Sequence, residues 1–384
     1  MNKKIAQYIW LLIMALILIN ACKKDIIEVP ITPELKPFRL IWNVSDIESK
    51  QELEIGLKWY FSILGATLPI DSWTKGVEWH NETHFSINYK ELGFNSRAIE
   101  KLNQLADLYR STGEFKATDG IDVGRFVANT LNNSNHYYQI VGMPSSYTDF
   151  LEGNKMASYH GAINPSSVSF GYRKILFPDF TNLKMTFVSE EFLNDFTVSQ
   201  IEPVEFETID VMPNGQLRYG IYENGNLISG ANPVFSAGGK PSKCMWCHES
   251  VFLPNFSSTK PFSGYVSGQA FNDTMAYHNK ELTELRAELN SMFDYSKRKE
   301  HTQMELIYIR FYEPSATRLA NEWGISIDDV KSRLASLKTH IHHEFPELGD
   351  LYYRDEVDPF APFSSLSSPK KMRETEDGQP ELLI

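Results

Sequence analysis

Hydrophobic residues recur at helical spacing in two stretches of the first part of the chain. Residues 50–64 (KQELEIGLKWYFSIL) and 96–111 (SRAIEKLNQLADLYRS) carry apolar residues three and four positions apart, which is the repeat of a helix with one buried face. In the second stretch Ile99, Leu102 and Leu105 fall on the same face. We therefore expect two amphipathic helices here.

The pattern changes to partial alternation after about residue 184. Turn residues at 213–215 (Pro-Asn-Gly) and 224–225 (Asn-Gly) separate short apolar runs, and Asn-Gly is the strongest short signal for a β-hairpin. We predict a small antiparallel β meander over about 184–231. Its expected strands lie in KMTFVSEEF, PVEFETIDVM, QLRYGIY and NLISG.

Helical spacing returns in the last third of the chain. Ser326 with Asp329 resembles a capping arrangement in front of an apolar face within 330–337. A further helix is expected from the spacing of four residues, Leu282, Leu285, Leu289 and Met292.

The fold class that these elements predict is α+β. We expect a mixed region over 38–231 that includes the meander at about 184–231, and then a mainly α-helical, cytochrome c-like domain over 232–366. The tail over 367–384 is polar and is expected to be loose.

Residues 1–21 have the features of an export signal. Lys3 and Lys4 precede the apolar run 9–19 (IWLLIMALILI), and the small residue Ala21 ends the segment. A permanent membrane helix is the alternative, but such a helix needs about 20 apolar residues. The shorter run therefore favours a signal peptide.

The sequence Ile19-Asn20-Ala21-Cys22 resembles the lipobox of bacterial lipoproteins. The resemblance implies that Cys22 is lipidated and becomes the first mature residue, so that acyl chains hold the protein on a membrane. The proline-rich residues 22–37 would then form an extended tether. The implied location is the cell envelope, on the outer membrane, at its periplasmic or its surface face.

The charge of the chain excludes one class of partner. It has 37 Lys and Arg against 49 Asp and Glu, and loss of residues 1–21 removes two lysines and no acid, which leaves a formal charge of −14. Nucleic acid and anionic lipid surfaces would repel such a protein. The 42% hydrophobic content is sufficient for large cores.

The two remaining cysteines lie in Cys244-Met245-Trp246-Cys247-His248. In an exported protein, Cys-x-x-Cys-His resembles the haem-attachment motif of c-type cytochromes. The resemblance covers these five residues. It implies that both thiols form thioethers with one haem c, and that His248 is an axial ligand of the iron.

Three other interpretations of the cysteine pair stay open. A redox-active dithiol would need lowered thiol pKa values. A structural zinc site would need further ligands, such as His340, His342 and His343. A structural disulfide would close a very short loop and stabilise little.

The sixth ligand of the iron is open as well. Met304 is the first candidate because it shares helical spacing with Ile307 and Phe311, although a core methionine would have the same pattern. An unfilled sixth position would allow small molecules to bind. The other candidate ligands are Met275, Met292, His278 and His301.

Residues near the motif have expected supporting roles. Lys240 and Lys243 could pair with haem propionates, and Trp246 or Phe252 could shield the ring from water. Lysines of a solvated loop and aromatic residues of an ordinary core would give the same sequence pattern.

The expected function is that of a lipid-anchored extracytoplasmic monohaem c-type cytochrome, which transfers single electrons between redox partner proteins of the envelope. Because over half of the chain precedes the motif, an envelope binding or assembly module with an accessory haem is one alternative. A haem peroxidase or ligand-binding haem protein is the other. Whether the chain is an enzyme stays open, and electron transfer is favoured over catalysis.

Overall fold

The computed structural model describes residues 38–45, 47–152, 154–166, 168–179, 185–234, 236–254, 261–370 and 372–374. The predicted signal over 1–21, Cys22 and the tether over 22–37 lie outside these residues, as do 375–384. Residues Pro37–Ile384 form a compact unit. Within the described part of this unit, no helix is both long enough and apolar enough to cross a membrane.

The mixed α and β content that the sequence predicts is confirmed, and a small sheet opens the fold. Its strand order is β2-β3-β1-β4, with β1 antiparallel to β3 and parallel to β4. The strands are β1 (Phe38–Ile41), β2 (Val77–Trp79), β3 (His84–Ile87) and β4 (Ile121–Asp122).

The two amphipathic helices predicted from apolar spacing are confirmed as α2 (Lys50–Ile63) and α4 (Ser96–Arg110). A capping box starts α2, because the Ser49 side chain accepts from the Glu52 N–H and the Glu52 carboxylate accepts from the Ser49 N–H. Helix α11 (His301–Tyr312) packs against α2 at Gly56, where an added Cβ would lie 2.6 Å from a backbone oxygen of α11.

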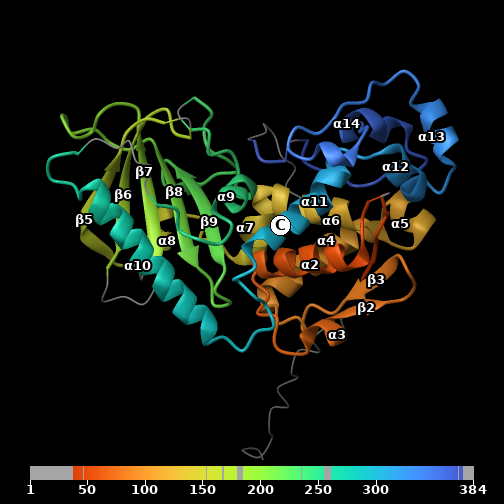
Figure 1. Cartoon of the computed structure of the whole chain (residues 1–384), viewed down its shortest axis with the longest axis horizontal. Coiled ribbons are helices and arrows are strands. Elements are labelled where there is room, and N and C mark those ends of the chain that lie inside the picture. Colours follow the sequence, from red (N-terminus) through yellow and green to blue (C-terminus); the bar gives the residue numbers. More distant parts are fainter. Residues whose placement is uncertain are drawn as a thin grey trace, which may run out of the picture. The chain divides into compact units, whose positions relative to one another are not determined.

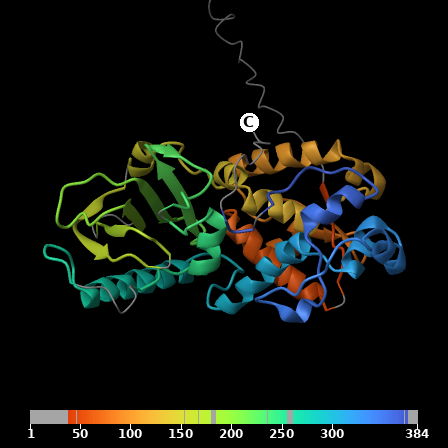
Figure 2. The same cartoon turned by 90° about the horizontal axis from the view of Figure 1, so that it is seen from above.

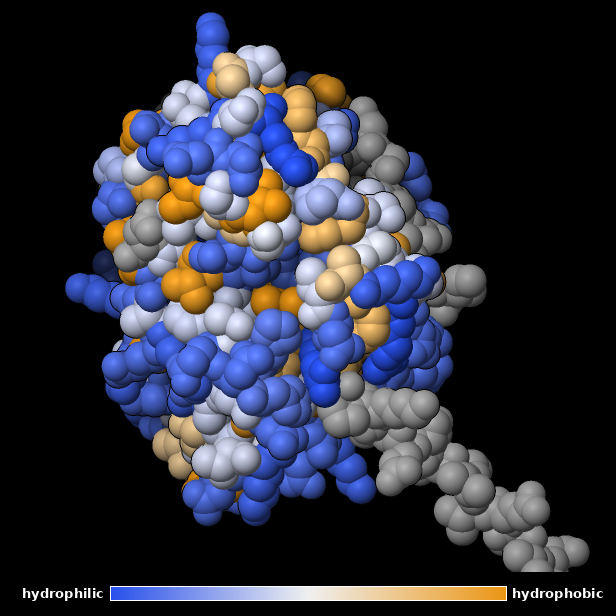
Figure 3. All heavy atoms as spheres, turned by 90° about the vertical axis from the view of Figure 1, so that its right-hand side faces the viewer, coloured by the Kyte–Doolittle hydropathy of each residue, from blue (hydrophilic) through white to orange (hydrophobic). Residues whose placement is uncertain are grey.

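Short helices complete this part of the unit. The predicted Ser326 cap is confirmed, since its side chain accepts from the Asp329 N–H at the start of α13. On one side of this part, hydrophilic residues dominate and hydrophobic residues form separate small groups (Figure 3). The helices are α3 (Ser72–Gly76), α5 (Gly113–Thr118), α6 (Val123–Val127), α7 (Ser134–Val141), α8 (Tyr147–Leu151), α11 (His301–Tyr312), α12 (Ala316–Trp323), α13 (Ile327–Arg333) and α14 (Arg354–Val357), with a π-helical segment at Ala128–Asn132.

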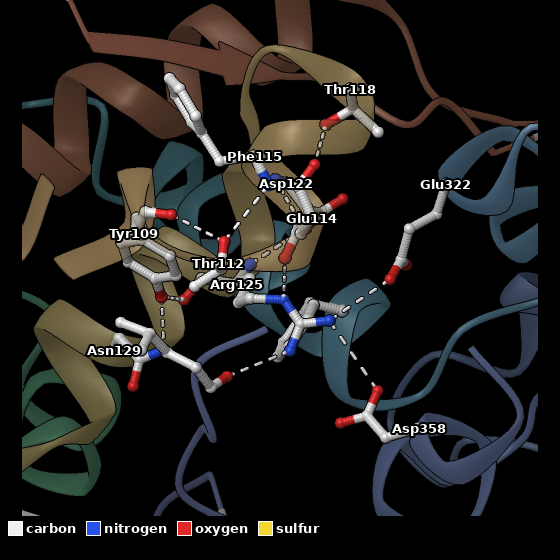
Figure 4. A network of polar contacts seen from close by, with 12 residues as sticks. Tyr109, Thr112, Glu114, Phe115, Thr118, Asp122, Arg125, Asn129, Glu322 and Asp358 are labelled. Carbon is white, nitrogen blue, oxygen red and sulfur yellow. Dashed lines mark hydrogen bonds and ion pairs between the residues drawn. The ribbon is translucent and has the colours of Figure 1, made fainter. Parts of the chain in front are cut away.

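A buried network of ion pairs joins segments that are distant in sequence (Figure 4). Arg125 on α6 lies 2.9 Å from a Glu114 oxygen and 3.4 Å from a Glu322 oxygen on α12. Arg318, also on α12, lies 2.6 Å from an oxygen of Asp122 at the end of β4. These pairs hold the carboxyl-terminal helices against the amino-terminal part.

The predicted meander is confirmed and is larger than expected. Six antiparallel strands follow one another in the order β10-β9-β8-β7-β6-β5. The two strands that the sequence pattern missed, β5 (Met156–Ile163) and β6 (Tyr172–Pro178), alternate weakly, because their buried residues are the last three of each strand. The remaining strands are β7 (Thr186–Phe192), β8 (Glu205–Val211), β9 (Leu217–Glu223) and β10 (Asn226–Leu227).

Helix α10 (Gly268–Ala287) lies along one face of the six-stranded sheet (Figures 1 and 2). The Phe271 ring packs on Phe177 of β6 with centroids 5.4 Å apart, and the His278 ring packs on Phe187 of β7 at 5.2 Å. The prediction of one helix over 282–292 is wrong at its end. The helix stops at Ala287, because the chain then turns back and residue 292 donates its N–H to the carbonyl of residue 68 at 2.8 Å.

Candidate cofactor-binding site

The Cys-x-x-Cys-His residues form the end of helix α9 (Pro241–His248), which packs against β9 (Figure 1). Proline at the first position suits a helix start. Directly after His248, Glu249 and Ser250 both adopt left-handed backbone, with φ of +41° and +67°. Such conformations are unfavourable for residues other than glycine. Arg286 helps to hold this turn by donating to the Ser250 carbonyl at 2.9 Å.

The tail of the chain fixes the other end of α9. The Lys240 N–H donates to the Arg373 carbonyl at 3.0 Å, and the Ser242 hydroxyl donates to the Met372 carbonyl at 2.8 Å. The Arg373 guanidinium also lies 4.1 Å from the ring centroid of Trp246. Residues 372–374 are therefore packed, which differs from the loose tail that we expected at this point.

A cavity of about 220 Å³ lies between α9 and the six-stranded sheet, and Cys244, Cys247 and His248 all line it. The structure thus brings together the three residues that the motif predicted. Further polar lining residues are Arg173, Ser189, Glu207, Thr208 and Tyr219. The apolar lining residues are Ile163, Val168, Ile175, Phe187, Ile209, Leu253, Pro254 and Phe271.

His248 is prepared for coordination by its backbone partner. Its Nδ1 lies 3.1 Å from the carbonyl oxygen of Val251, and because a carbonyl only accepts, Nδ1 carries the proton. Burial lowers the pKa of His248 to about 4, so the ring is neutral near pH 7. Its Nε2 lone pair is then available, as an iron ligand requires.

The two thiols are not in an activating environment. Burial raises the pKa of Cys244 well above its usual range, and the nearby Glu207 carboxylate adds to the effect. Burial also raises the pKa of Cys247. Catalytic thiols have lowered pKa values, since the thiolate is the nucleophile. The geometry therefore disfavours the redox-active dithiol.

The candidate sixth ligands do not line the cavity. Met304 is buried on α11, which packs against α2. Met275 and His278 lie on the buried face of α10. Met292 follows α10, and His301 lies 3.2 Å from a Glu305 oxygen. The segments after residue 37 that the structure leaves undescribed contain no Met or His.

The predicted basic partners lie elsewhere. Lys240 is fully buried and donates to the Asn132 carbonyl at 3.0 Å, and Lys243 does not line the cavity. Instead Arg173 lines it, with a buried Nε that has no hydrogen-bond partner among the described residues. Phe252 contacts the cavity wall, where its ring centroid lies 4.5 Å from that of Phe187.

The histidines considered for a zinc site do not share the cavity of the two cysteines. The His340 Nε2 lies 2.7 Å from a Glu313 oxygen, and its ring stacks on Tyr353 at 4.0 Å. None of His340, His342 and His343 lines the cavity. Within the described ranges, no group of three or more His, Cys, Asp or Glu side chains is placed to hold a metal ion.

A larger cavity of about 650 Å³ lies beside the small sheet. Its acidic lining residues Glu114 and Glu322 both pair with Arg125. These carboxylates belong to the ion-pair network, so the cavity at α9 is the stronger candidate site despite its smaller volume.

Comparison of the chain with models of protein families, with curated proteins and with solved structures gave no significant match.

The residues that line the α9 cavity are suited to hold the edge of a haem that is covalently attached through the two thiols. They supply two thiols, a neutral imidazole with a free Nε2, and apolar walls that exclude water. The volume lies below the roughly 300 Å³ at the lower end of ligand sites, and a porphyrin is larger than this cavity. The cavity would therefore hold one edge of a haem, and Cys244, Cys247 and His248 are the residues that would attach it.

Proposed function

We propose that this protein is a lipid-anchored, exported monohaem c-type cytochrome. Cys244 and Cys247 hold haem c, His248 binds the iron, and Cys22 carries the lipid anchor in the outer membrane. The protein exchanges single electrons with redox partner proteins of the cell envelope and does not act on nucleic acid. One observation carries the proposal: a single short helix presents both thiols and a neutral imidazole to one largely apolar cavity.

The residues of the chain would bind the haem, orient its His248 ligand and shield it from water. Haem c supplies the one-electron redox chemistry when it is attached. The Val251 carbonyl fixes the tautomer and the ring orientation of His248. Apolar walls from the sheet and from Phe271 exclude water, and this exclusion raises the reduction potential of a haem.

The haem-binding unit that we propose differs from the helical domain expected over 232–366. It consists of α9, α10 and the six-stranded sheet, because side chains from β6, β7, β8 and β9 line the cavity together with α9. Met304 as sixth ligand stays a prediction, and it would require the haem to reach α11.

A pyridine haemochrome spectrum of acid-acetone-extracted protein tests the proposal. The parent, produced in a host with haem-attachment machinery, should show a c-type α-band, and the Cys244→Ala/Cys247→Ala variant should show none. Cys22→Ala is the matched control, because it removes a cysteine but should leave the haem in place. A parent without covalent haem would contradict the proposal and favour zinc and thiol assays on the same pair.

A second candidate function is a haem protein that binds small ligands. The observation in its favour is that His248 is the one His or Met among the described residues that line the cavity, so these residues would offer a bound haem iron a single protein ligand. Carbon monoxide added to the reduced protein should then shift the haem spectrum at once. Failure of carbon monoxide and of cyanide to bind would exclude this function and favour a protein ligand from α10 or α11.

A further inference from the structure

Three glutamates gather on the cavity face of the six-stranded sheet. Glu205 and Glu207 on β8 lie two residues apart, so their side chains share one face. Glu191 on β7 pairs in register with Glu205, and Glu207 pairs with Ser189 of β7. Glu191 and Glu205 are almost fully buried, and Glu207 lines the cavity itself.

Hydroxyl groups satisfy two of the three carboxyls. Glu191 accepts from the Ser189 hydroxyl at 2.8 Å and from the Ser169 hydroxyl. Glu207 accepts from the Ser236 hydroxyl at 3.0 Å.

Glu205 is less well satisfied than its two neighbours. Its Oε2 accepts from the Asn232 N–H at 2.9 Å. Its Oε1 is buried and has no hydrogen-bond partner within the described residues. A buried, incompletely bonded carboxylate is unfavourable, and the neutral acid is the less unfavourable form.

Positive charge around the three carboxyls is scarce. From β6, Arg173 pairs in register with Glu191. From β9, Glu223 adds negative charge near Glu205. Lys174 does not help, because it pairs with Glu190 on the other face of the sheet at 2.5 Å.

The residues of helix α9 that line the cavity add no positive charge to the cluster. It presents Cys244 and Cys247, whose raised pKa values keep them neutral, and the neutral His248. Its Lys243 acts on the two thiols. Several carboxyls thus face one guanidinium, and burial with mutual repulsion raises the pKa of Glu191 and of Glu205 to about 8.

We infer that Glu191, Glu205 and Glu207 form a proton-binding site, with Glu205 as its main acceptor, that takes up a proton when the cofactor in the adjoining cavity is reduced. This inference rests on the proposed function. With haem c bound, each electron that the redox partner supplies would be accompanied by one proton, which a carboxylate of the site would take up from water. Oxidation returns both. Two buried carboxyls and a third that lines the cavity, with Arg173 in register beside Glu191, carry the inference.

The direction of the coupling follows from charge. Reduction removes one positive charge from the iron, so protonation of a nearby carboxylate becomes easier. The reduction potential should therefore fall as the pH rises near 8, where Glu191 and Glu205 titrate. If one proton is taken up with each electron, the equilibrium constant of reduction changes tenfold per pH unit. The reduction potential then falls by about 59 mV per pH unit.

Spectroelectrochemical titration of the haem-loaded full chain between about pH 6 and about pH 10 tests the coupling. The parent should show a negative slope near pH 8, and Glu205→Gln and Glu191→Gln/Glu205→Gln should flatten it. Glu202→Gln is the matched control, because Glu202 is exposed three residues before Glu205 and should keep the parent slope. A flat parent, or an unchanged slope in the double variant, would overturn the inference.

Infrared titration of haem-free protein separates this result from the proposed function. A protonated carboxyl band should persist at neutral pH, disappear above about pH 9, and be weaker in Glu205→Gln. If haem binds but the potential does not depend on pH, the coupling is wrong and the cytochrome proposal stands. If the infrared band behaves as expected but no haem attaches, the cytochrome proposal fails and the coupling fails with it.

Discussion

The protein contains two buried polar regions that handle charge in opposite ways. In the ion-pair network of the helical part, each buried arginine faces a carboxylate, as in Arg125–Glu114 at 2.9 Å (Figure 4) and Arg318–Asp122 at 2.6 Å. Beside the cavity at α9, Glu191, Glu205 and Glu207 share one face of the sheet, Arg173 pairs in register with Glu191, and the imidazole of His248 is neutral. Balanced buried charge serves to hold segments together, whereas unbalanced buried groups point to chemistry.

The pKa values of Glu322 and Glu205 illustrate this difference. Burial alone would raise the pKa of Glu322, but the guanidinium groups of Arg354 and Arg125 outweigh it, and the pKa is lowered. Burial raises the pKa of Glu205 to about 8, and the neighbouring Glu207 adds to the rise. The comparison therefore predicts that substitutions in the two regions will change the free energy of unfolding by different amounts, with opposite signs and with different pH dependence.

The largest expected effect is in the balanced region. Arg318→Met should lower the free energy of unfolding by about 3–5 kcal/mol, because it leaves Asp122 buried without its partner. Urea unfolding followed by circular dichroism measures the loss. Lys280→Ala is the control for an exposed pair, Lys280–Glu284 at 3.3 Å, and should cost about 0.5 kcal/mol or less. Equal losses in the two variants would show that the buried network does not stabilise the fold.

A substitution in the unbalanced region should have the opposite sign at high pH. The folded-state pKa of Glu205 is about 8, above the usual 4.5, so the folded state holds a proton that the unfolded chain has released. The stability from this group is complete below pH 4.5 and is lost as the pH rises through about 8. Glu205→Gln should therefore gain about 1–3 kcal/mol at high pH.

Urea unfolding at about pH 4 and about pH 9 checks this prediction. At the lower pH, Glu205→Gln and the parent should match, because the parent side chain is already neutral. Glu202→Gln, at an exposed position, should change stability by less than about 0.5 kcal/mol at both values. A gain for Glu205→Gln that is independent of pH would show that the carboxyl is not the group that titrates.

Local features of the fold could be predicted from sequence, and contacts that depend on strand register could not. Helices α2 and α4 follow from apolar spacing and from caps at Ser49 and Asn95 that lie beside them in the chain. Strands β5 and β6 were missed because they bury few residues in alternation. Without them, the sheet that forms the wall of the cavity could not be recognised.

At the candidate site, too, residues adjacent in sequence could be predicted and residues brought together by strand register could not. Cys244, Cys247 and His248 are adjacent in sequence, and the motif alone was sufficient to select them. Arg173 and Glu207 were missed, because they come from different strands and meet at the cavity only through the pairing of β6, β7 and β8. One signal was present: Glu205 and Glu207 alternate with Phe206 and Thr208, which places two acids on one face of a strand.

Acid should weaken the fold through His248. Burial lowers its folded-state pKa to about 4 from the usual 6.5, so the unfolded chain gains a proton first and stability is lost as the pH falls between these values. His248→Gln should remove on the order of 1 kcal/mol of this acid sensitivity in haem-free protein. His136, whose pKa is also lowered to about 4 by burial, provides the comparison variant His136→Gln. Identical acid sensitivity in His248→Gln and the parent would mean that the imidazole at the cavity already accepts a proton in the folded state.

The smallest expected effect separates the support of α9 from its chemistry. Trp246 lies inside the motif, but its ring packs under the Arg373 guanidinium at 4.1 Å and does not line the cavity. Trp246→Leu should cost about 0.5–1 kcal/mol through the lost cation–π contact, and it should leave the haem content per protein unchanged. Haemochrome quantification beside urea unfolding measures both. Haem loss in Trp246→Leu would show that packing of the tail on α9 controls attachment, and the division between a supporting side and a reactive side of this helix would then fail.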